Sequence, residues 1–219
     1  MKNKPLLIFR IAAVAISLFS TSYRMFIEPM HGHSLRGLFY QLGFFSVQSS
    51  LFITFMFVML LINQLRGKED AWPTPAFRGA ALLYGILTSI LFGCFFAQSF
   101  DLHGLNLVVL YINHIGLTLL IMVDNIVSVP PQTYKFDLLI YWMIYPLYYL
   151  IFTIYESLVL QINRYYFIVM DTPNQNFYPY VIFLMAMVFL LCAVIIIFIN
   201  KVFRKKLDDD PFYIPEKKQ

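Results

Sequence analysis

Two apolar stretches of the chain carry the side chains best suited to chemistry. Ser46, Ser49 and Ser50 are spaced i, i+3 and i+4, so their hydroxyls would share one face of a helix. The stretch 105–129 carries His114 near its middle. A serine hydroxyl becomes a useful nucleophile when a neutral histidine within hydrogen-bond reach takes its proton. With Ser46 as nucleophile and His114 as base, these residues indicate cleavage or transfer of an acyl ester.

Further polar side chains near this pair could stabilise a developing oxyanion. The candidate donors are Gln48, Ser49, Ser50 and Asn113. One such donor can contribute roughly 3 kcal/mol to a transition state. Glu156 is the nearest candidate for a third member of the catalytic group.

Structural roles would explain the same serine and histidine. Serines in membrane helices often let two backbones approach closely. A lone histidine inside a membrane is a functional-site hypothesis by default, but a hydrogen bond to another helix would satisfy it too. The sequence therefore leaves a packing role for Ser46 and His114 open beside the catalytic one.

A second polar pair is expected nearer the opposite membrane face. Arg10 and Asp124 each interrupt an apolar stretch and are the only opposite charges expected at their depth. Intramembrane charges usually pair with one another or face water. We predict an Arg10–Asp124 ion pair that fixes the register of two helices, although a catalytic role is also open.

The composition indicates a membrane protein. Of the 219 residues, 60% are hydrophobic and only 13% are charged, and the mean hydropathy is +0.70. Soluble domains carry about 25% charged residues. No basic cluster with interleaved aromatic residues lies outside the apolar stretches, so we expect no nucleic-acid partner.

No metal or cofactor is expected. Cys94 and Cys192 fall inside apolar stretches and form no Cys/His metal spacing. His31 and His33 form an isolated H-x-H pair that lacks a third ligand.

Six stretches are long enough to cross a bilayer, which takes about 20 apolar residues in a helix. They are expected at about 5–23, 37–63, 77–99, 105–129, 136–157 and 178–199. We predict an all-α polytopic integral membrane protein. It is a single domain, 1–219, with six transmembrane helices in one bundle and a short solvated cytoplasmic tail from about 203.

The distribution of basic residues predicts the orientation. One side of the membrane would carry Lys2, Lys4, Arg66, Lys68, Arg78, Lys135 and the tail cluster, whereas the other carries only Arg24, Arg36 and Arg164. Because lysine and arginine concentrate in cytoplasmic loops, we expect a multi-pass protein of the cell membrane with both termini in the cytoplasm. Trp72 and Trp142 would then belong to an aromatic belt on the cytoplasmic side.

This orientation brings the candidate residues to one level. Ser46 and His114 each lie about nine residues, or roughly 13 Å, below the outer ends of their helices. Asp124 lies about 15 Å further in. The sequence thus predicts a shared site in the outer half of the membrane.

Four segments, in the same order, resemble one family of small polytopic proteins. They are FRIAAVAISL, FFSVQSSLF, NHIGLTLLIMVD and DLLIYWMIYPLYYLIFTIYE, and together they cover most of the chain. The chain resembles the family of the androgen-induced membrane protein and the androgen-dependent regulator of tissue factor pathway inhibitor, in its microbial branch.

The resemblance implies a hydrolase of fatty acid esters of hydroxy fatty acids. It implies that Ser46 matches the intramembrane threonine nucleophile of the animal members and that His114 matches their histidine. Ser49 stands where the animal members have an acidic residue, and Leu119 replaces their proline. The expected partner is thus a membrane lipid or fatty acyl ester.

Two other functions stay open from the sequence. A lipid acyltransferase would use the same serine and histidine with a different acceptor. A non-enzymatic transport or assembly protein is also conceivable, but the paired repeats or broken helices typical of transporters are not visible in the sequence.

Overall fold

The computed structural model describes residues 4–27, 35–68, 72–96, 103–129, 133–165 and 178–208. Every regular element in these ranges is helical, which confirms the all-α prediction. The helices are α1 (Lys4–Ser22), α2 (Leu35–Leu42), α3 (Phe45–Leu65), α4 (Pro75–Leu91), α5 (Gly104–Tyr111), α6 (Leu117–Ser128), α7 (Leu138–Val159) and α8 (Tyr178–Asp208). Six helical segments of the described part are long and apolar enough to cross a membrane.

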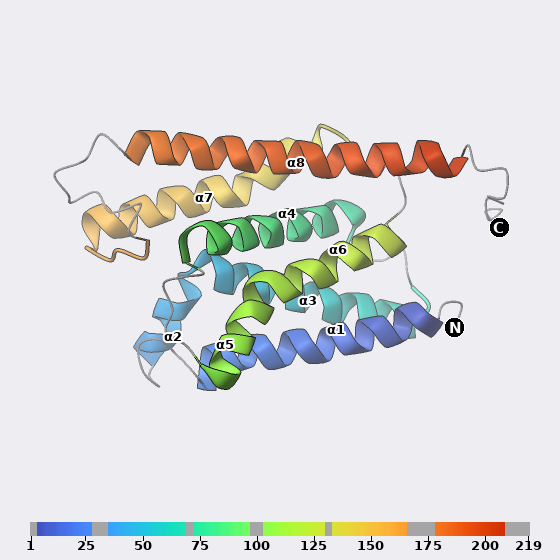
Figure 1. Ribbon diagram of the computed structural model, residues 1–219, viewed down its shortest axis with the longest axis horizontal. Helices are drawn as coiled ribbons and strands as arrows, with labels where there is room; N and C mark the ends of the chain where they lie inside the picture. Colours follow the sequence, from blue (N-terminus) through green and yellow to red (C-terminus); the bar gives the residue numbers. More distant parts are fainter. Residues whose placement is uncertain are drawn as a thin grey trace.

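The long helices run roughly along one axis, and α4 lies between α8 on one side and α1 and α3 on the other (Figure 1). About 61% of the α4 span is buried, the largest share of the six. The start of α1 and the end of α8 lie at the same end of the bundle (Figure 1). This arrangement is the one expected of an even number of spans.

The second predicted span is broken in the structure, so the single helix expected at 37–63 is wrong. The chain turns at Gly43 and Phe44, between α2 and α3. A new helix starts there because the Phe45 N–H donates to the hydroxyls of Tyr149 and Tyr165, at 2.9 and 3.0 Å. These phenols take the place of an N-cap side chain.

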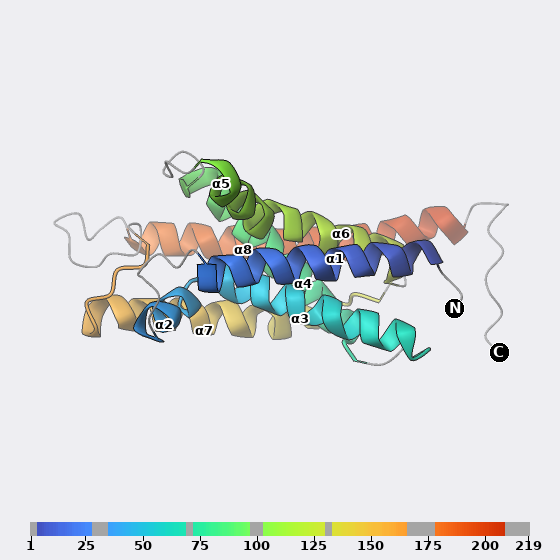
Figure 2. The same cartoon turned by 90° about the horizontal axis from the view of Figure 1, so that it is seen from below.

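Three π-helical turns interrupt or extend the helices at one end of the bundle. They are Tyr23–Ile27 after α1, Phe92–Phe96 after α4 and Ile112–Gly116 between α5 and α6. At the last of these turns α5 and α6 meet at an angle (Figure 2). Single π turns are frequent at functional sites.

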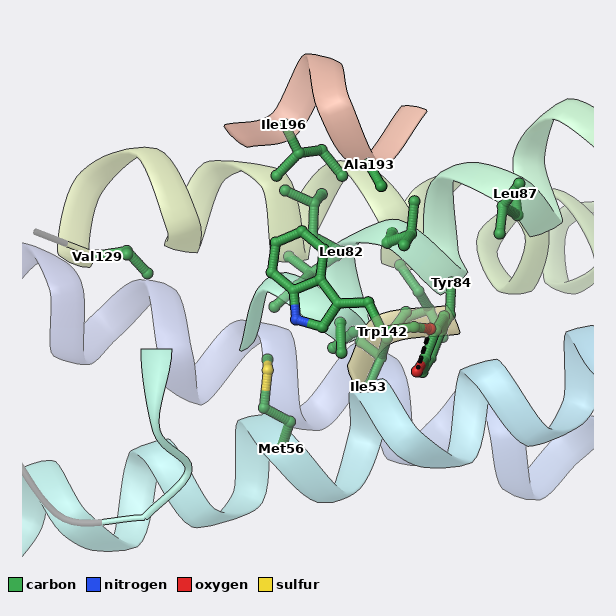
Figure 3. Packing of buried hydrophobic residues seen from close by; sticks show 14 of the residues in the cluster. Ile53, Met56, Leu82, Tyr84, Leu87, Val129, Trp142, Ala193 and Ile196 are labelled. Atoms are coloured by element: carbon green, nitrogen blue, oxygen red, sulfur yellow. Dashed lines mark hydrogen bonds between the residues drawn. The ribbon is translucent and has the colours of Figure 1, made fainter. Parts of the chain in front are cut away.

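Trp142 lies in the core rather than in an interfacial belt. Its side chain is 2% exposed and belongs to the buried hydrophobic cluster that includes Ile53, Met56 and Ile196 (Figure 3). The indole Nε1 donates to the Ala76 carbonyl at 2.8 Å. The belt prediction is wrong for Trp142, because α7 turns this residue towards α4. Trp72 is 40% exposed, as an interfacial residue would be.

The last helix is longer than expected. α8 continues to Asp208, beyond the predicted start of a solvated tail at about 203. The basic cluster at 201–206 therefore belongs to the same helix as the apolar stretch before it.

Candidate functional site

Ser46 and His114 line the same small pocket between α1, α3 and the π turn Ile112–Gly116. Its volume is about 10 Å³, close to the minimum for a single water molecule. The other lining residues are Thr21, Arg24, Val47, Ser50 and Asn113. The tertiary structure thus brings the two predicted catalytic residues together.

The Ser46 hydroxyl is half-buried, in the first turn of α3. Within the described ranges it makes no hydrogen bond, to His114 or to any other group. Catalytic hydrogen bonds are often long in ligand-free structures and shorten when substrate binds. Ser46 and His114 thus line one pocket without a hydrogen bond between their side chains.

Two contacts hold the imidazole of His114, and a third holds its backbone carbonyl. The Nδ1 atom lies 2.8 Å from the Leu110 carbonyl oxygen. Because a carbonyl only accepts, Nδ1 carries the proton and Nε2 keeps its lone pair. The ring stacks on Phe92 at 4.4 Å between centroids, and the Ser89 hydroxyl donates to the His114 carbonyl at 2.5 Å. The nitrogen able to act as a base is therefore fixed by the fold.

Of the four proposed oxyanion donors, Ser50 and Asn113 line the pocket. The Asn113 amide nitrogen already donates to the carbonyls of Ser20 and Val109, both at 3.0 Å. The Ser50 hydroxyl donates to the Asn113 carbonyl at 3.3 Å. Asn113 is therefore a poor hydrogen-bond donor to substrate. Ser50 could donate to substrate only by giving up its hydrogen bond to the Asn113 carbonyl.

Gln48 and Ser49, the other two proposed donors, do not line this pocket. Residues two apart on a helix lie about 200° apart around its axis, which sends Gln48 to the opposite face. There its amide donates to the Leu42 carbonyl at 2.7 Å. The Ser49 hydroxyl is buried and has no hydrogen-bond partner in the described structure.

Glu156 is bound elsewhere. Its carboxylate accepts two hydrogen bonds from Arg164, at 2.5 and 2.6 Å. Burial lowers the pKa of Arg164, but the hydrogen bonds and charge of Glu156 outweigh this and raise it above the ordinary value. Glu156 is therefore held by Arg164 and does not line the pocket of Ser46 and His114.

Arg24 is the charged residue that the sequence analysis missed, because it was assigned to an outer loop. It is buried in the π turn after α1 and lines the pocket beside Ser46 and His114. The available signal was its spacing from Ser20 and Thr21, which continues a polar face of α1 by one turn.

The predicted Arg10–Asp124 ion pair is present, with Arg10 Nε 2.9 Å from Asp124 Oδ1. The expectation that these are the only charges at this depth is wrong. Arg78, counted among the basic residues of the cytoplasmic side, lies in α4 and also binds the Asp124 carboxylate. Arg10 further donates to Gln64 at 3.1 Å and to Ser128 at 3.0 Å. Two guanidinium groups share one carboxylate here.

No group of three or more metal-binding side chains occurs in the part of the chain that the structure describes. His31 and His33 lie outside that part.

In comparisons with known proteins, no family model, curated protein or solved structure matches the chain.

Proposed function

We propose that this protein is a multi-pass membrane enzyme that cleaves fatty acyl esters, with Ser46 as nucleophile and His114 as general base. The observation that carries the proposal is the pocket shared by these two residues. The segments that resemble the androgen-induced membrane protein family favour the same pair, and we include membership of that family in the proposal.

The proposed reaction follows from the orientation of His114. Its Nε2 takes the proton of the Ser46 hydroxyl while Oγ attacks the carbonyl carbon of the ester. His114 then gives this proton to the departing alcohol, and the acyl group stays bound to Ser46 as an ester. Water hydrolyses this acyl-serine and releases the fatty acid. Arg24 supplies positive charge at the wall of the pocket, where the oxyanion would develop.

An ester chain is larger than the pocket, so substrate must widen it. Arg24 and His114 both lie in π-helical turns, where the regular helical hydrogen bonding is already interrupted. We place the opening at these turns, because local rearrangement costs least where the helix is irregular.

Reaction with a lipid-like fluorophosphonate tests the nucleophile. The purified protein should be labelled, and Ser46→Ala and His114→Ala should each abolish labelling. Ser49→Ala is the matched control, since it removes a hydroxyl from the same helix outside the pocket and should label normally. Undiminished labelling of Ser46→Ala would contradict the assignment.

We further propose that the protein lies in the cell membrane with both termini in the cytoplasm. Four basic residues lie within three positions of a helix terminus: Lys4, Arg66, Lys68 and Lys135. These termini are at the same end of the bundle as the start of α1 and the last turn of α8 (Figure 1). A concentration of basic residues at that end favours its retention in the cytoplasm.

A further inference from the structure

A groove of about 770 Å³ lies between α3, α4 and α7 and shares no lining residue with the Ser46 pocket. Its volume is typical of a small-molecule site. Phe55 and Tyr141 at its edge are 53% and 67% exposed, so the groove opens to the surroundings of the bundle. Its walls include Leu51, Phe52, Phe77, Ala80, Leu138 and Trp142.

The polar side chains deep in the groove are already satisfied by the protein. Tyr84 donates to the Trp142 carbonyl at 3.1 Å, and the Trp142 indole donates to the Ala76 carbonyl at 2.8 Å. Tyr145 donates to the Gln48 side chain, whose own amide nitrogen donates to a backbone carbonyl at 2.7 Å. A polar ligand would lose its hydrogen bonds to water without replacement, whereas hydrocarbon loses none.

The two halves of α7 meet α3 differently. Beyond Pro146, the Tyr149 hydroxyl donates to the Gly43 carbonyl at 2.8 Å and accepts from the Phe45 N–H at 2.9 Å. Before Pro146, Tyr145 still reaches α3 through its hydrogen bond to Gln48, whereas Leu138 and Tyr141 border the groove that lies between α7, α3 and α4. Protein interiors are close-packed, so a gap of this size next to lipid has to be filled by another molecule.

We infer that the groove holds one acyl chain of a membrane lipid. The ester end lies near Thr74 and Tyr141, at the end of the bundle where α4 and α7 begin. The groove follows α7 from Leu138 to Tyr145, which is roughly 10 Å along the helix. The inference relies on the proposed membrane location but not on catalysis by Ser46. The bound chain fills the space beside the direct contact that Tyr145 makes with Gln48 of α3.

Quenching of tryptophan fluorescence by brominated lipid tests this site. The chain has two tryptophans, so Trp72→Phe leaves Trp142 as the only one. The Trp142 side chain is 2% exposed, and lipid outside the groove is kept from it. In bilayer nanodiscs of phosphatidylcholine brominated in mid-chain, Trp142 should be measurably quenched because it lines the groove, although less than an exposed reporter. That reporter is Ile151→Trp, at a position 68% exposed, in a Trp72→Phe, Trp142→Phe background.

Filling the groove should remove the effect. Ala80→Leu projects extra carbons into it and should lose most of the Trp142 quenching; Ala76→Leu, at a half-buried position, serves if that variant does not fold. Ala15→Leu on the exposed face of α1 is the matched control and should keep the quenching. Unquenched Trp142 beside a quenched Ile151→Trp reporter would overturn the inference. If neither reporter is quenched, the membrane location itself is contradicted.

Discussion

At the scale of single residues, the buried charge cluster is the most demanding feature of this protein. Asp124 is fully buried, and Arg10 and Arg78 are 4% and 5% exposed. Removing a charge from water costs several kcal/mol per ion. The attraction of the single Asp124 carboxylate must offset this cost for both guanidinium groups. The carboxylate is therefore the member whose loss should matter most.

Substitution of Asp124 should destabilise the protein more than substitution of Arg10. Asp124→Leu leaves two like charges buried together and should cost about 3–5 kcal/mol. Arg10→Leu leaves the neutral Arg78–Asp124 pair and should cost less. The measurement is the unfolding free energy of the reconstituted protein.

The double variant separates the charge effect from simple loss of packing. Arg10→Leu should partly restore stability in the Asp124→Leu background, because it removes one of two uncompensated charges. Asp137→Leu, at an exposed position, should change stability by less than about 0.5 kcal/mol. Additive losses in the double variant would argue against a shared cluster.

At the scale of elements, the junction between α2 and α3 is held by the segment that follows α7. Arg164 donates to the Tyr40 carbonyl at 2.5 Å and forms the buried ion pair with Glu156. Its guanidinium lies against the Cα of Gly43, where any side chain would clash. This contact fixes the direction in which α3 starts, and with it the position of Ser46 in the first turn.

Gly43→Ala should lower the unfolding free energy by about 1–3 kcal/mol, because the added methyl group displaces the Arg164 guanidinium. In an Arg164→Ala background the same substitution should cost little. Gly93→Ala is the matched control, since a methyl group there meets no atom within 4 Å. Thermal unfolding in detergent measures all of these, and equal losses at Gly43 and Gly93 would contradict the proposed contact.

At the scale of the whole molecule, the exposed surface is apolar along the helices. Ile8, Phe39, Ile140, Ile151 and Phe183 are each 65% exposed or more. A soluble protein rarely shows so much contiguous apolar surface, whereas a bilayer covers it at no cost. The surface and the basic residues at one end together define how the bundle would sit in a membrane.

Cysteine accessibility tests the proposed orientation. In a background without Cys94 and Cys192, a membrane-impermeant thiol reagent added to intact cells should label Leu160→Cys but not Lys68→Cys. Both positions are exposed and lie at opposite ends of the bundle. Permeabilised cells provide the control, in which both variants should be labelled. The reverse pattern would place the termini outside.

The sequence alone determined the helical class, the presence of six segments apolar enough to cross a membrane, and the pairing of Arg10 with Asp124. Apolar length is a local property, and a buried charge demands an opposite one nearby. The same logic put Ser46 and His114 at one depth. Each of these predictions depends on composition and rise per residue, which hold for any packing of the helices.

Only the tertiary structure decided which faces meet. It turned Gln48 away from Ser46, brought Arg24 to the His114 pocket and placed Arg78 beside Asp124. It also buried Trp142 in the core. The rotation of each helix about its own axis is set by its neighbours. A helix that is apolar on all sides and has few polar residues gives little indication in its sequence of which face is buried.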